Sequence, residues 1–135
     1  MKLSSFCLGV CLSFFWSGIS LACDLTKTEK SAHGIGENYT VSFLTTPEKI
    51  MVGMPFSILL TVCKNNGEAF DGSVKVTASM PAHGHGMNYK PSVAKLSGGK
   101  FNMEGFLFHM PGRWQYAFDL TDGSAAEKIL INHKL

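Results

Sequence analysis

Imidazole and thioether side chains are concentrated in one glycine-rich stretch, residues 80–91, which reads Met-Pro-Ala-His-Gly-His-Gly-Met-Asn-Tyr-Lys-Pro. His83, His85 and Met87 lie within it, and no Asp or Glu occurs between residues 72 and 103. Neutral imidazole and thioether sulfur suit copper, above all Cu(I), whereas Ca²⁺, Mg²⁺ and Mn²⁺ require oxygen ligands. Zinc is an alternative through the histidines, although methionine is a poor ligand for it. The stretch predicts a soft-metal site, against the ordinary alternative of an exposed turn.

Short segments of β character, each bounded by turn signals, carry these side chains. Apolar and polar residues alternate in several of them, and no segment has the periodicity of an amphipathic helix. About seven short strands in about 100 residues are typical of an all-β, immunoglobulin-like antiparallel β-sandwich, with a small barrel as the alternative. The predicted strands are 39–46, 56–63, 73–80, 92–97, 101–110, 113–121 and 127–132.

The direction of successive strands assigns each connection to one of two ends of this sandwich. If consecutive strands are antiparallel, residues 47–55, 81–91 and 111–112 connect strands at the same end. His109 and Met110 finish a strand at that end, because one strand, a Gly-Gly turn and a second strand separate them from the glycine-rich stretch. The predicted metal ligands are His83, His85, Met87 and His109, with Met80, Met110 and Met54 as second choices.

The remaining tryptophan and histidines of the domain have ordinary interpretations. Trp114 begins an inward-facing aromatic row and is predicted to anchor the core, with shielding of a copper ion as the minor alternative. His33 and His133 lie outside the predicted ends of the strands, and both are predicted to be solvated surface residues rather than ligands.

The first 22 residues have the features of a secretory signal peptide. Lys2 precedes an uncharged, largely apolar run, and the small residues Ser20 and Ala22 stand at positions −3 and −1 of a cleavage point after Ala22. A membrane anchor is the alternative, but the apolar part is short and serine-rich for a span of about 20 residues. We therefore expect export to the periplasm or another extracytoplasmic space, a polar leader at residues 23–38 and one domain at residues 39–135.

The cysteines allow two fates for residue 23. Removal of the signal would leave Cys23 and Cys63, an even number that predicts one disulfide in an oxidising compartment. The sequence before Cys23 is also similar to a bacterial lipoprotein box, except that Ser20 stands where leucine is usual. Lipidation would anchor the chain to a membrane and leave Cys63 as a free thiol. Strand direction places Cys63 at the end opposite the histidines, where the leader arrives, which makes the disulfide sterically feasible.

Charge and motifs exclude several classes of function. The formal net charge is +2 and no cluster of basic residues occurs, so neither nucleic acid nor an anionic membrane surface is expected as a partner. No Ser-His-Asp or Cys-His arrangement is recognisable, so we expect no enzyme. Copper delivery, buffering or tolerance in the envelope, with a copper donor or acceptor protein as partner, is the first hypothesis. A metal-free interaction module that docks through its glycine-rich loop is the alternative.

The motifs of the second half resemble those of the YtkA-like domain family of small exported bacterial proteins. The similarity is carried by Asp71-Gly72, by the run from His83 to Met87, and by Met110-Pro111-Gly112 with Trp114 after it. It extends over about residues 39–132. The resemblance implies an immunoglobulin-like β-sandwich and a link with copper handling or with respiratory oxidase assembly.

Overall fold

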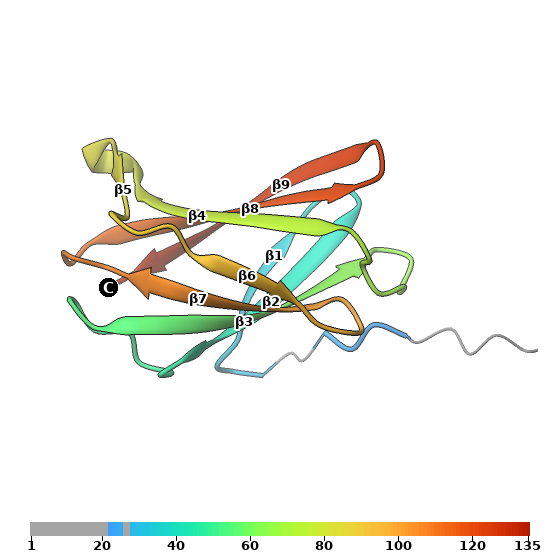
Figure 1. The fold of residues 1–135 in the computed structure, drawn as a ribbon, viewed down its shortest axis with the longest axis horizontal. Helices are drawn as coiled ribbons and strands as arrows, with labels where there is room; N and C mark the ends of the chain where they lie inside the picture. The colour runs from blue at the N-terminus through green and yellow to red at the C-terminus, as the bar shows by residue number, and fades with distance from the viewer. Residues whose placement is uncertain (1–21, 26–27) are drawn as a thin grey trace, which may run out of the picture.

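The computed structural model describes residues 22–25 and 28–135, which form two antiparallel β-sheets packed face to face (Figure 1). Apart from Ala22, the predicted signal peptide lies outside the described residues. None of the helices in the described part is long and apolar enough to cross a membrane. The elements are β1 (Ala32–Ile35), β2 (Tyr39–Thr46), β3 (Pro55–Lys64), β4 (Ser73–Met80), the 3₁₀ helix η1 (Pro81–His83), β5 (His85–Gly86), β6 (Ser92–Lys95), β7 (Lys100–Leu107), β8 (Arg113–Asp122) and β9 (Ala125–Lys134).

The order of the strands confirms the predicted immunoglobulin-like sandwich. One sheet has the order β1-β2-β3-β7-β6 and the other the order β5-β4-β8-β9. Without the two short strands β1 and β5, a four-stranded and a three-stranded sheet remain, connected as in the constant-type immunoglobulin domain. The two sheets share no hydrogen-bonded strand pair within the described residues, so the barrel alternative is wrong.

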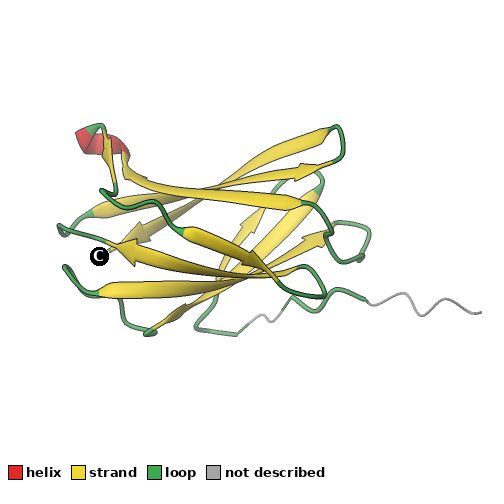
Figure 2. Ribbon diagram, viewed as in Figure 1, coloured by secondary structure: helices red, strands yellow, loops and turns green. Residues whose placement is uncertain are grey.

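The described residues form nine strands, where the sequence predicts about seven, and one predicted strand is too long (Figure 2). The additional strands are β1, which lies in the segment predicted as a leader, and the two-residue β5 in the glycine-rich stretch. The strand predicted at 101–110 ends at Leu107, because its partner β3 begins at Pro55, which is paired with Leu107. His109 and Met110 therefore lie in the connection that follows β7.

A single aromatic core fills the space between the sheets and extends to the end of the sandwich at which β4 and β7 finish. The inward row of β8 begins with Trp114 and Tyr116, which are fully buried. The ring of Tyr116 contacts that of Phe43 in the opposite sheet edge to face, with centroids 5.1 Å apart. Large buried rings of this kind dominate the energy of a core.

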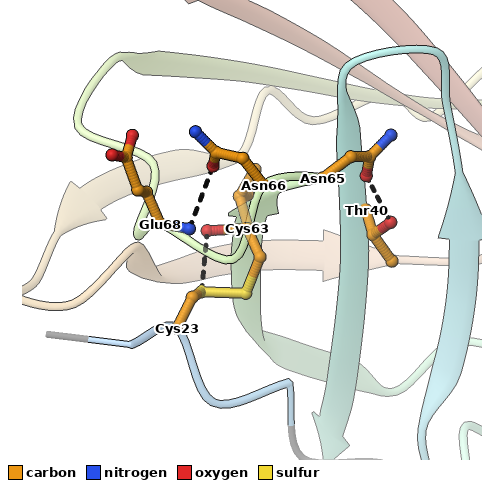
Figure 3. Close-up of a disulfide and its surroundings, with 7 residues drawn as sticks. Cys23, Thr40, Cys63, Asn65, Asn66 and Glu68 are labelled. Carbon is orange, nitrogen blue, oxygen red and sulfur yellow. Dashed lines mark hydrogen bonds between the residues drawn. A yellow bond between two sulfur atoms is a disulfide. The ribbon is translucent and has the colours of Figure 1, made fainter.

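The disulfide predicted between Cys23 and Cys63 is present and ties the leader to the domain (Figure 3). The Cα atoms are 5.6 Å apart, and the backbone N–H of Cys23 donates to the carbonyl oxygen of Gly67 over 3.0 Å. A sulfur atom in a disulfide cannot also carry the thioether of a lipid anchor. The leader is held further by β1, which pairs with β2, and by the carboxylate of Glu127, which accepts a hydrogen bond from the backbone N–H of Asn38 over 2.9 Å.

Candidate metal site at one end of the sandwich

The predicted ligands lie where β4 and β7 finish and β3 and β8 begin, on the left in Figure 1. We call this the histidine end, defined by His83, His85 and His109. His83 is in η1, His85 is in β5, and His109 is in the connection between β7 and β8. The cysteines are at the opposite end of β3, as strand direction predicts.

The glycine-rich stretch forms a tight reversal that places two of the imidazoles side by side. Pro81 begins η1, where its fixed φ is compatible with the helix and its missing N–H is not needed. Gly84 ends η1 in the left-handed conformation, with φ of 65°, and its N–H donates to the carbonyl oxygen of Met80 over 3.0 Å. The chain then returns along β4, so that His85 pairs with Met80. The ring centroids of His83 and His85 are consequently 5.8 Å apart.

The connection after β7 brings the third imidazole to the same place. Its backbone is fixed on two sides, because the carbonyl oxygen of Phe108 accepts a hydrogen bond from the N–H of Gly53 over 2.8 Å, and that of Met110 accepts one from Nε1 of Trp114 over 3.1 Å. The ring centroid of His109 is 5.2 Å from that of His85. The structure therefore confirms the predicted convergence of the three rings, while their role as ligands stays a prediction.

Trp114 forms the inner wall of this cluster as well as anchoring the core. Its ring meets His109 edge to face at 5.4 Å and His85 at 6.4 Å, and it stacks on Phe108 at 4.2 Å. The side chain is fully buried, so the prediction of a core anchor is confirmed. Since the indole also borders two imidazoles, it closes the cluster toward the core and leaves the approach from solvent on the side of His83, which is exposed.

The spacing of the rings is compatible with one shared ion. Two imidazoles bound to one metal through bonds of about 2.0–2.1 Å have ring centres roughly 5–6 Å apart. Nδ1 of His109 is buried and has no hydrogen-bond partner in the described part of the chain. Such a nitrogen is costly to leave unsatisfied, and a bound cation would satisfy it. Within residues 22–25 and 28–135, no group of three or more His, Cys, Asp or Glu side chains is already arranged to hold a metal, so a site here requires ring rotation or methionine sulfur.

The four methionines predicted as ligands differ in their access to this end. Met87 is half-buried against the core, and its N–H donates to the carbonyl oxygen of Ala78 over 3.1 Å. Met110 is half-buried in the same connection as His109. Met80 is buried. Its methyl group lies against Gly112, 2.6 Å from the position that a Cβ atom would occupy if residue 112 had a side chain. Met54 is half-exposed in a turn next to Phe108. The four side chains thus range from the buried Met80 to the half-exposed Met54, with Met87 and Met110 half-buried.

His133 is not the solvated surface residue that the sequence predicts. Its side chain is half-buried opposite Trp114 on the neighbouring strand, and its ring is 6.2 Å from those of Phe108 and Tyr116. Burial disfavours the charged imidazolium and lowers the pKa of His133 below its ordinary value of 6.5. Burial likewise raises the pKa of Tyr116, whose hydroxyl has no hydrogen-bond partner among the described residues.

Acidification is expected to destabilise the protein through His133. Because the pKa is lower in the folded chain than in the unfolded one, the unfolded chain takes up a proton first as the pH falls below 6.5, and the free energy of unfolding decreases. The decrease ends once the pH is below the folded pKa. Urea titrations across this pH range should give a falling midpoint for the wild type and a flatter profile for His133→Asn. His33→Asn, which alters an exposed histidine of β1, should keep the wild-type profile; a flattened profile in this control would assign the effect elsewhere.

Comparisons with known proteins agree with this architecture. The family model described as YtkA-like matches residues 35–119, a range that includes all the predicted ligands. Among solved structures, the chain is similar to the crystal structure of a DUF4426 family protein from Pseudomonas aeruginosa PAO1, with 10% identity and a TM-score of 0.57 over 81% of this chain and 97% of that chain. This likeness shows the fold alone. No curated protein matches the sequence.

Proposed function

Because the chain belongs to the YtkA-like family, we propose that it is a small copper-binding protein of the cell envelope, which delivers, buffers or sequesters the metal. One observation carries the proposal: three imidazoles from η1, β5 and the connection after β7 converge at one end of a rigid sandwich, with adjacent centroids 5.8 and 5.2 Å apart. Three imidazoles grouped in this way are suited to bind a single soft or borderline cation.

The donor set favours copper over other metals. His83, His85 and His109 offer neutral nitrogen, Met87 offers sulfur as a fourth donor, and Met80, Met110 and Met54 are the further candidates. Imidazole with thioether suits Cu(I), and imidazoles alone hold Cu(II). The histidine-bearing stretch contains no carboxylate, so hard cations lack their preferred ligands.

The unequal exposure of the ligands favours transfer of copper rather than permanent storage. His83 is exposed and His85 and His109 are half-buried, while Trp114 closes the inner side. A donor or acceptor protein in the envelope could therefore reach the ion from the side of His83, exchanging one ligand at a time. Assembly of a respiratory oxidase is one process that would use such a transfer.

The proposal predicts that the purified, metal-free protein binds about one Cu(I) per chain. Anaerobic titration against a chromogenic Cu(I) chelator measures the stoichiometry, and native mass spectrometry of the same sample checks the mass of the complex. Zn²⁺ serves as the comparison, because sulfur ligands discriminate against it less well than against hard cations. Failure to retain Cu(I), or saturation by Zn²⁺ in preference to Cu(I), would contradict copper as the cargo.

A further inference from the structure

One side of the sandwich carries an open strand edge that is distinct from the imidazole cluster. β4 lies at the edge of its sheet except at Ser79 and Met80, which pair with the two-residue β5. A groove of about 600 Å³ runs along it, between β4 and the segment that leads from Gly86 through Pro91 to Val93. In Figure 1 this segment and β6 pass beneath β4 along the same side.

The backbone of β4 has unused hydrogen-bonding groups that point into this groove. In an antiparallel pair, the N–H and C=O of successive residues point alternately to the two neighbours of a strand. The carbonyl oxygen of Ala78 accepts from Met87, so Ala78 points away from β8. By alternation, Val76 and Val74 point the same way. Among the described strands, β4 pairs on that side at residues 79 and 80, and the bond from Met87 to Ala78 extends this contact by one residue but does not reach Val76. A free strand edge of this kind is a template for an added strand.

The side chains that line the groove suit an alternating apolar and charged segment. Tyr89 and Val93 are apolar residues that are 58% and 37% exposed along its length. Lys75 and Lys90 add two positive charges, and neither forms an ion pair with any residue that the structure describes. The acidic residue in the lining is Asp119, whose carboxylate is already bound by Lys128 at 3.2 Å.

We propose that β4 binds an extended, acidic segment of another protein, which adds to the sheet as a further strand beside Val74 and Val76. One face of that strand would lie on the apolar lining, and acidic side chains on the other face would meet Lys75 and Lys90. A second copy of this chain is a poorer occupant, because Lys75 would then meet lysines of the same groove, and edge lysines oppose such pairing. Gly86 and Met87 also line the groove, so a bound segment would end beside the histidine end.

The proposal is tested with the full-length, metal-free protein and two blocked hexapeptides, one alternating valine with glutamate and one alternating valine with lysine. We expect the glutamate peptide to bind and to slow hydrogen exchange at the amides of Val74 and Val76, as followed by NMR. Lys75→Glu should weaken binding of this peptide about tenfold, since it replaces an attractive cross-strand pair by a repulsive one. It should strengthen binding of the lysine peptide.

The matched control is Lys49→Glu, which makes the same change of charge at an exposed residue between β2 and β3, outside the groove. If both variants weakened binding of the glutamate peptide equally, the effect would be one of net charge alone, and the proposal would be overturned. The absence of binding, protection at another strand edge such as β9, or protection of Val74 and Val76 by self-association without peptide would overturn it as well. Because copper is absent throughout, the result is independent of whether the protein binds the metal.

Discussion

Replacement of both His83 and His85 by alanine is expected to abolish high-affinity copper binding without unfolding the protein. The two side chains belong to η1 and β5, which project from the end of β4 and contribute no residue to the hydrophobic core. Loss of a single outer-sphere partner of a metal ligand reduces affinity about 10–100-fold, so loss of two direct ligands should reduce it by more. Competition with a Cu(I) chelator measures the affinity, and circular dichroism checks the fold.

The control for this variant is His33→Ala, which removes an exposed histidine of β1, a strand of the other sheet. It should bind copper as the wild type does. His109→Ala should weaken binding as well, and it distinguishes a site shared between two connections from one confined to the glycine-rich stretch. An unchanged affinity in the double variant would exclude the proposed ligands.

Removal of the disulfide by Cys23→Ala together with Cys63→Ala is expected to lower the free energy of unfolding substantially. The bridge joins residues that are 40 positions apart, and the loop-entropy model gives a loss of about 4 kcal/mol for a loop of that length. Urea denaturation of the variant measures the loss. Copper affinity of the folded variant should be unchanged, because the bridge and the histidines are at opposite ends of the sandwich.

Reduction of the wild-type protein should reproduce the lower stability of the double variant, which separates loss of the bridge from the effect of the alanines. Equal unfolding midpoints for the oxidised wild type and the variant would show that the bridge does not stabilise the domain. Loss of copper binding in the folded variant would show instead that the two ends are coupled.

The architecture of the histidine end could be anticipated from the sequence because strand direction depends on few features. Alternating apolar residues in β3, β4 and β8 identify the strands, and each clear turn reverses the chain. Two intervening strands, β6 and β7, therefore return His109 to the end that carries His85. Only the parity of the number of strands matters here, so an error of a few residues in the end of β7 leaves His109 at the same end of the sandwich.

The missed elements are those in which backbone pairing, rather than side-chain pattern, determines the structure. β1 has no buried residue, and it pairs with β2 along one side only. β5 has two residues, too few for any periodicity. The burial of His133 is missed for a different reason. The predicted strand ends at residue 132, whereas β9 continues to Lys134, and this extension places the imidazole opposite Trp114. The last residues of β9 are polar, so the apolar alternation that identifies strands in the sequence does not extend to them.

The most direct test of the shared site is ¹⁵N NMR of the histidine side chains during titration with Cu(I), which is diamagnetic and leaves the ring signals visible. We expect the ring-nitrogen signals of His83, His85 and His109 to shift together and to saturate at about one equivalent, as for imidazoles bound to one ion. Signals of His33 and His133 should stay in place. Shifts confined to His33 or His133, or an absence of any saturable shift, would contradict a copper site at the histidine end.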